Sequence, residues 1–402
     1  MVQHDGPPAR VQVSAGDRVR EGMRIGKAPS KEGAHVHAPV PGTVVEVKEI
    51  FLVGGVKSVA VTIDLAGEFD RLGKESPVHE WRRLPVSRLL EEIAERGVVG
   101  MGGYGIPTAH KYRQRRGQSI RTLIVNGAES EPYRTSDHRI MLEYAAEIVE
   151  GIEIAAAIVA PEEVIVGIEA NKADAASVLT QEIRKRDLPY RVVRMPVKYP
   201  QGDERQMVRA LTDTDYQFGE SPESVGVMVS NVATLLAVYQ AVVRHKPLIE
   251  RVVTVAGGAV AKPANLKVRI GTPVSQLLQD CGGFTEQPAK IVCGGPLTGH
   301  AVFDPETPIT KGVGCVLALT KREVKGASTT ACIQCGKCIR ACPVGLEPVR
   351  LYKLIDHGQN DRAASEGLYE CCECGACSFI CPSRVPLVQG IKVGKRIARE
   401  SA

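Results

Sequence analysis

Eight cysteines near the carboxyl-terminal end of the chain have a spacing that suits redox chemistry. They form two runs of the pattern C-x2-C-x2-C-x3-C-P, one beginning at Cys332 and the other at Cys371. In paired 4Fe–4S clusters with this spacing, three cysteines of a run bind one cluster, and the fourth, before proline, binds the other. The two runs therefore predict a relay that carries electrons one at a time.

The same spacing predicts which cysteines bind each cluster. The first cluster is expected to use Cys332, Cys335, Cys338 and Cys381. The second cluster is expected to use Cys371, Cys374, Cys377 and Cys342. Structural zinc is disfavoured, because each run holds four cysteines and no histidine pair lies nearby. A disulfide framework is also disfavoured, since we expect no secretory signal at the start of the chain.

Four further cysteines fall outside this pattern. Cys372 is adjacent to a predicted ligand, so we expect it to be a spare thiol near the second cluster. Cys281, Cys293 and Cys315 lie in apolar or glycine-rich stretches without ligand spacing, and they are expected to be small core residues.

Composition and length indicate an ordinary globular protein of two to four domains. The chain has 402 residues, 44% hydrophobic and 24% charged, which is too long for a single hydrophobic core. Its net charge of +5 is mild, its basic residues are spread out and only 4% of residues are aromatic, so we expect no nucleic-acid partner. The longest uncharged run, residues 225–243, contains several polar residues. It is interpreted as a strand (225–229) and a helix (232–243) rather than a membrane span.

The fold class predicted is a multidomain α/β and β protein. Short strands and glycine turns over residues 1–70 resemble a barrel-sandwich hybrid of the lipoyl and biotinyl kind. Such carriers present a lysine between methionines at a hairpin tip, and no Met-Lys motif occurs here. A docking role is therefore favoured over a swinging arm.

Strands and helices alternate over residues 85–250, which predicts a mostly parallel sheet with helices on both faces. Strands are expected at 122–125 and 163–168, with helices at 89–96, 137–159 and 171–186. Residues 251–320 return to short strands and form a small β module. Residues 325–402 carry the cysteines on a helical frame, with helices at 347–355, 361–368 and 387–398.

A glycine-rich stretch, residues 100–108, enters a helix that contains Lys111. Glycine lets a planar ring or a phosphate approach the backbone, and Lys111 adds positive charge. Polar loops at 126–133, 199–206 and 231–234 accompany it, and two of them follow predicted strands, where open α/β sheets bind ligands. Each loop alone is more often a surface turn. Together they predict one pocket for a redox cofactor.

With these motifs the chain resembles the RnfC family, the NADH-oxidising subunits of Rnf ion-translocating electron-transport complexes. The resemblance covers nearly the whole chain, including residues 3–9, the glycine-rich loop, residues 294–299 and both cysteine runs. The flavin core also resembles the NADH-binding subunit of respiratory complex I. The resemblance implies an SLBB (β-grasp-like) module at residues 251–320. The chain starts close to the barrel motif, and we expect it to lack the longer amino-terminal segment usual in the family.

The resemblance also implies the cofactors and the residues that hold them. FMN would be held by Gly100, Gly102, Gly103, Gly105, Lys111, Asn126, Glu129, Gly202, Asp203, Glu204 and Asn231. NADH would stack on the flavin near Glu131, the implied catalytic residue. Where the complex I pattern has phenylalanine and aspartate, this chain has Ile106 and Ala128.

The function implied is an NADH-dependent oxidoreductase. Electrons would pass from NADH through FMN and two 4Fe–4S clusters to membrane and iron–sulfur subunits of an Rnf complex, and indirectly to ferredoxin. The chain would be peripheral at the cytoplasmic face of the cell membrane. Two alternatives stay open: a soluble relative such as a cobalamin reductase or the proline-reductase-associated protein, and a flavin-free iron–sulfur relay.

Overall fold

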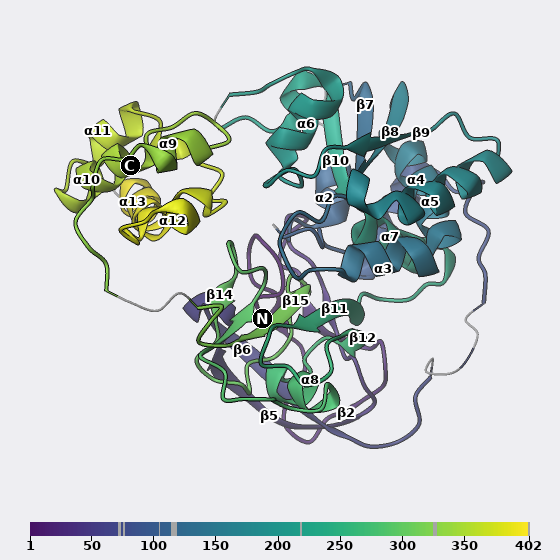
Figure 1. The fold of residues 1–402 in the computed structure, drawn as a ribbon. Helices are drawn as coiled ribbons and strands as arrows, with labels where there is room; N and C mark the ends of the chain where they lie inside the picture. Colours follow the sequence, from purple (N-terminus) through teal and green to yellow (C-terminus); the bar gives the residue numbers. More distant parts are fainter. Residues whose placement is uncertain are drawn as a thin grey trace.

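The computed structural model describes residues 1–70, 74, 77–103, 105–113, 119–217, 219–324 and 328–400. Tyr104 of the predicted glycine-rich loop and residues 325–327 and 401–402 of the predicted cluster domain lie outside these residues. Figure 1 shows the helices α9 to α13 as a body beside α6, and the amino-terminal strands lying with the later β module below the α/β layers.

The amino-terminal region is built from two small antiparallel sheets, as the alternation of apolar and turn residues predicts. Their orders are β1-β3-β4 and β2-β5-β6. The strands are β1 (Arg10–Val11), β2 (Arg18–Val19), β3 (Arg24–Lys27), β4 (Val36–His37), β5 (Gly42–Phe51) and β6 (Lys57–Leu65). A 3-10 turn, η1 (Val53–Gly55), closes the long β5–β6 hairpin. Small and branched side chains such as Val19, Ile25 and Val44 fill the space between the sheets.

The next region contains a parallel sheet of order β10-β7-β8-β9. Its strands are β7 (Thr122–Asn126), β8 (Glu163–Glu169), β9 (Arg191–Met195) and β10 (Val227–Asn231). The helices are α1 (Val86–Glu95), α2 (Thr108–Tyr112), α3 (Ser136–Glu143), α4 (Ala145–Val159), α5 (Ala173–Lys185), α6 (Glu204–Thr212) and α7 (Val232–Val243), with 3-10 turns η2 (Ala170–Lys172) and η3 (Pro222–Val225). Buried β-branched residues dominate β7 and β8, as expected for strands covered on both faces.

The predicted strand and helix within the long uncharged run are confirmed as β10 and α7. Asn231 caps α7, with its side-chain oxygen accepting a hydrogen bond from the Ala233 backbone N–H at 2.9 Å. Eleven of the twelve α7 residues are buried, so the apolar run belongs to the protein core. Among the helices of the described residues, none combines the length and apolarity needed to cross a bilayer.

The prediction of one long helix over residues 137–159 is wrong. The helix breaks at Tyr144, whose φ of −126° and ψ of 33° are not helical, and α3 and α4 meet there. The break lets α3 reach the neighbouring β module. Immediately before α3, the Thr135 backbone N–H donates to Thr254 Oγ1 of β11 at 3.1 Å, whereas α4 packs along α7.

The β module contains a five-stranded mixed sheet of order β12-β11-β15-β13-β14. Its elements are β11 (Glu250–Ala256), β12 (Ala264–Arg269), α8 (Val274–Asp280), β13 (Lys290–Cys293), β14 (His300–Ala301) and β15 (Cys315–Leu319). The helix α8 was not predicted from the sequence. Cys281, Cys293 and Cys315 are buried here, at 1%, 3% and 1% exposure, which confirms them as core residues.

Lys311 joins three regions of the chain. Its Nζ donates to the backbone oxygens of His35 at 2.8 Å and Gly97 at 2.7 Å, and its backbone N–H donates to Gln3 Oε1 at 3.0 Å. Burial lowers the pKa of the Lys311 ammonium to about 7. The barrel region and the α/β region are thereby fixed against the β module.

The carboxyl-terminal region is helical, as predicted. Its elements are α9 (Lys337–Ala341), α10 (Pro348–Asp356), α11 (Asn360–Ser365), a 3-10 turn η4 (Leu368–Glu370), α12 (Ala376–Ile380) and α13 (Leu387–Glu400). The helix expected at 361–368 ends earlier, at Ser365, and Gly367 in a left-handed conformation leads into η4. A small core around Leu351, Leu368 and Ile391 holds these short helices together.

Candidate flavin and iron–sulfur sites

A hollow of about 570 Å³ lies at the carboxyl ends of β7 and β10. Its lining joins the glycine-rich loop, the start of α2, the β7 end, the start of α6 and the start of α7. The lining residues that fall within the predicted loops are Gly100, Gly102, Gly103, Gly105, Ile106, Thr108, Lys111, Asn126, Gly202, Glu204, Asn231 and Thr234. Segments more than a hundred residues apart therefore meet at this edge of the sheet, as the strand–loop pattern predicted.

Hydrogen bonds hold the glycine-rich loop over the sheet. The Met101 backbone N–H donates to Thr234 Oγ1 at 2.9 Å. Below the loop, Tyr112 Oη and Ser230 Oγ lie 2.6 Å apart in a buried hydrogen bond. Tyr112 and Ser230 were not predicted as part of the site. The sequence could have indicated them, because Tyr112 directly follows Lys111 and Ser230 directly precedes Asn231, and both of those residues were predicted site residues.

Lys111 is the one cation among the described residues that line the hollow. Its Nζ lies 2.7 Å from Glu204 Oε1, and both side chains are about four-fifths buried. Asn126 Nδ2 donates to the Gly202 carbonyl oxygen at 2.9 Å, which joins the end of β7 to the segment before α6. Asp203 lies outside the lining and caps α6, where its carboxylate accepts from the Gln206 N–H at 3.2 Å. Burial raises the pKa of Asp203.

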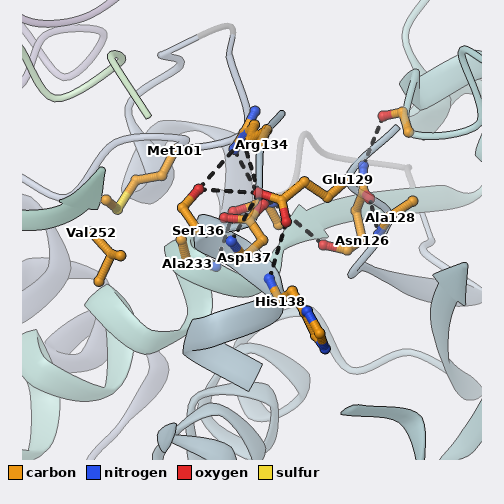
Figure 2. Close-up of polar contacts among 12 residues, drawn as sticks. Met101, Asn126, Ala128, Glu129, Arg134, Ser136, Asp137, His138, Ala233 and Val252 are labelled. Atoms are coloured by element: carbon orange, nitrogen blue, oxygen red, sulfur yellow. Dashed lines mark hydrogen bonds and ion pairs between the residues drawn. The ribbon is translucent and has the colours of Figure 1, made fainter. Parts of the chain in front are cut away.

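Glu129 is not among the residues that line the hollow, and Figure 2 shows its carboxylate among the residues at the start of α3. Its carboxylate accepts hydrogen bonds at the start of α3, from Ser136 Oγ at 3.1 Å and from the backbone N–H groups of Asp137 at 2.9 Å and His138 at 3.2 Å. It also pairs with Arg134 at 3.2 Å. Burial and the neighbouring Asp137 raise the pKa of Glu129.

A neighbouring residue connects this buried group to the hollow. Asp137 Oδ2 accepts from Asn231 Nδ2 at 2.8 Å, and Asn231 lines the hollow. The structure therefore places Glu129 behind the pocket wall as part of its support. Ala128, where the complex I pattern has aspartate, is buried in an apolar cluster with Ile124 and Met207.

Glu131 also lies outside the hollow. Its carboxylate accepts hydrogen bonds from a loop of the β module, at the Leu297 N–H (3.2 Å), the Thr298 N–H (2.9 Å) and the Thr298 hydroxyl (2.5 Å). A contact of this carboxylate with NADH stays a prediction.

The eight cysteines of the two runs gather in two groups, around separate cavities. One cavity, of about 680 Å³, is lined by Cys332, Cys335, Cys338 and Cys381. The other, of about 320 Å³, is lined by Cys342, Cys371, Cys372, Cys374 and Cys377. Both groups combine cysteines from the two runs in the crossed arrangement that the spacing predicted, and Cys372 lies beside the second group.

The thiol ligands of these groups suit 4Fe–4S clusters. Within the described part of the chain, no three His, Cys, Asp or Glu side chains lie close enough to hold a single metal ion. Each cavity is instead lined by cysteines drawn from both runs. Cys335 is exposed whereas Cys377 is buried, so the first group lies nearer the surface.

Four family models match successive parts of the chain. They are the RnfC barrel sandwich hybrid domain (residues 1–68), the Nuo51 FMN-binding domain (93–240), the SLBB domain (252–301) and the 4Fe-4S dicluster domain (328–385). The predicted fold class, with its four kinds of domain, is thereby confirmed.

The fold is similar to that of an NAD+-reducing [NiFe]-hydrogenase in the air-oxidized state. The TM-score is 0.52 at 17% sequence identity, over 78% of this chain and 54% of that one. The H2-reduced state gives a TM-score of 0.53. At this identity the likeness concerns the fold alone.

Curated relatives match over nearly the whole chain. The C subunit of the ion-translocating oxidoreductase complex of Rhodobacter capsulatus is 40% identical over 98% of this chain and 76% of its own length. The C subunit of the proton-translocating ferredoxin:NAD(+) oxidoreductase complex of Clostridium ljungdahlii is 38% identical over 89% of this chain and 78% of its own length. With an FMN-binding domain, a 4Fe–4S dicluster domain and this identity, the chain belongs to the RnfC family, the C subunits of ion-translocating oxidoreductase complexes.

Proposed function

We propose that this chain oxidises NADH through FMN and passes the electrons through the second and then the first 4Fe–4S cluster to other subunits of a membrane-bound Rnf complex. One observation carries the proposal. The loop that lines the flavin hollow at Gly202 also touches the second cysteine group, because Tyr199 Oη donates to the Cys374 carbonyl oxygen at 2.5 Å. The loop supplies a short bonded path between the two sites.

Open space at a glycine and the donors of the lining support FMN as the occupant of the hollow. At Gly103 an added Cβ would meet no protein atom within 4 Å, so the glycine leaves open space there. Lys111 and the backbone of the glycine-rich loop would hold the phosphate, with Asn126 and Asn231 on the walls. When bound, the flavin converts two-electron hydride chemistry into one-electron transfer. The chain's own part is to orient this cofactor and to hold the cysteine groups close to it.

A second contact fixes the cluster domain on the flavin side. Arg205 of α6 pairs with Glu370 of η4, directly before Cys371, and with Asp215 at 2.7 Å. The second cysteine group therefore faces the flavin hollow. The first group faces outward, with Ile333 at its rim 67% exposed. This order supports entry of electrons at the second cluster and exit at the first, toward a partner.

The anaerobic protein, loaded with FMN and both clusters, should oxidise NADH with an artificial one-electron acceptor. The reason is that the hollow and both cysteine groups lie on one connected path. Absorbance and electron paramagnetic resonance after NADH addition would follow the reduction of the flavin and the clusters. If the protein binds no FMN, and dithionite reduces both clusters but NADH reduces neither, the flavin-free relay takes the place of this proposal.

In cells, the native protein should sediment with membranes and be released by salt or a chaotrope. The helices of the described residues offer no span, so attachment would come from partner subunits at the cytoplasmic face. Immunoblots of membrane and supernatant fractions would measure it. Complete recovery in the supernatant while the other subunits are present would support the soluble-reductase alternative instead.

A further inference from the structure

A six-residue loop, residues 294–299, connects β13 to β14 and closes on itself. The Gly299 N–H donates to the Gly295 carbonyl oxygen at 2.9 Å. The turn presents two backbone N–H groups and the Thr298 hydroxyl to a single acceptor, the Glu131 carboxylate of the α/β region. Three donors on one carboxylate make a strong, charge-assisted contact between two domains.

The loop sequence is adapted to this contact. A Cβ on Gly295 would lie 2.2 Å from Glu131 Cδ, so the backbone of the loop rests directly on the carboxylate. Only glycine permits this approach. The contact therefore depends on both residues, Gly295 of the loop and the Glu131 carboxylate.

The opposite side of the loop touches the second cysteine group. A Cβ on Gly375 would lie 2.6 Å from the Leu297 carbonyl oxygen, so Gly375 sits against the loop. Gly375 lies between Cys374 and Cys377, and all three line the second cavity. Leu297 therefore has two contacts. Its N–H donates to Glu131, and its carbonyl oxygen lies against Gly375, between two cysteines of the second group.

Glu131 is in turn tied to the flavin hollow through its neighbour. Ser130 Oγ accepts a hydrogen bond from the Gly202 N–H at 3.0 Å, and Gly202 lines the hollow. A continuous set of contacts therefore runs from the hollow through Ser130 and Glu131 to the 294–299 loop, and from there to Gly375.

We propose that Glu131 is a positioning residue, which clamps the 294–299 loop so that the loop seats the second cysteine group against the flavin site. This role deepens the proposed function and rests on it. Electron transfer between two cofactors depends steeply on their separation, so the clamp acts on the rate from flavin to second cluster. A contact of Glu131 with NADH would act on the binding of NADH instead.

Two variants weaken the clamp from its two sides. Glu131→Gln removes the charge, and Thr298→Val removes the hydroxyl donor from a residue outside the hollow and both cavities. Amide hydrogen exchange at Leu297 and Thr298 should rise in both variants, in protein with or without cofactors. Stopped-flow reduction of the second cluster by NADH should slow by about tenfold or more, since small misplacements carry large rate costs. The Kd of NADH should change by less than about twofold, and its KM should not rise, because the clamp acts after NADH has bound.

A matched pair of glycines tests the other contact. Gly336 and Gly375 occupy equivalent positions in the two runs, and both have positive φ, +67° and +76°. At Gly336 an added Cβ would meet only the end of the Arg340 side chain, at 3.5 Å. Gly375→Ala should therefore raise hydrogen exchange in the 294–299 loop, whereas Gly336→Ala, with the same backbone strain, should leave that exchange unchanged.

The opposite pattern overturns the proposal. In that pattern Glu131→Gln raises the KM for NADH, exchange of the loop and reduction of the second cluster stay unchanged, and Thr298→Val has no effect. Glu131 would then contact the nucleotide alone. Failure of the proposed function looks different: the unchanged protein would not reduce its clusters with NADH, while the exchange measurements would still report the clamp.

Discussion

Replacement of Gly103 by valine should give a folded protein that holds both clusters but no FMN. Gly103 lines the hollow and has no protein atom within 4 Å of an added Cβ, so a branched side chain at this position should compete with the flavin for space. At the Gly103 φ of +142° any side chain is also strained. Flavin released on denaturation, measured against protein, should fall from about one per chain to near zero, and NADH oxidation should be lost with it.

Gly271→Val is the matched control. Gly271 also has a positive φ, +102°, and an added Cβ there meets no atom within 4 Å, but the residue lies in the turn before α8, away from the hollow. Both variants carry similar backbone strain, so similar thermal midpoints are expected, while only Gly103→Val loses flavin. Full flavin content in Gly103→Val would place the flavin elsewhere in the chain.

Replacement of Cys342 by serine should remove the second cluster and spare the first, although Cys342 belongs to the first run. Its side chain lines the cavity of Cys371, Cys374 and Cys377. The unchanged protein should hold about eight irons, and the variant about four. Because the second group faces the flavin, NADH should no longer reduce the remaining cluster, whereas dithionite should.

Cys381→Ser gives the complementary result, loss of the first cluster with the second still reduced by NADH. Cys372→Ser serves as the control, since this thiol lines the same cavity as Cys342 but lies outside the spacing pattern, and about eight irons should remain. Iron analysis and electron paramagnetic resonance would separate the cases. Loss of the first cluster alone in Cys342→Ser would contradict the crossed ligation.

Local patterns determined much of this protein from the sequence alone. The spacing of the cysteines is a local pattern, and it predicted the two groups that line the cavities, including the exchange of Cys342 and Cys381 between the runs. The bounds of α7 were also predictable, since Asn231 caps a run that is uncharged and mostly apolar. Strand ends followed by polar loops predicted the position of the hollow.

Other features depended on which segments meet in space. The apolar pattern continues through Tyr144, so nothing local marks the break between α3 and α4; only the tertiary structure shows that α3 contacts β11 of another domain while α4 packs along α7. Glu129 and Glu131 are two residues apart and look alike in the sequence. The Glu129 carboxylate accepts hydrogen bonds from the start of α3, whereas the Glu131 carboxylate accepts them from the 294–299 loop. The tertiary structure decides which donors each carboxylate meets, and a buried carboxylate needs such donors.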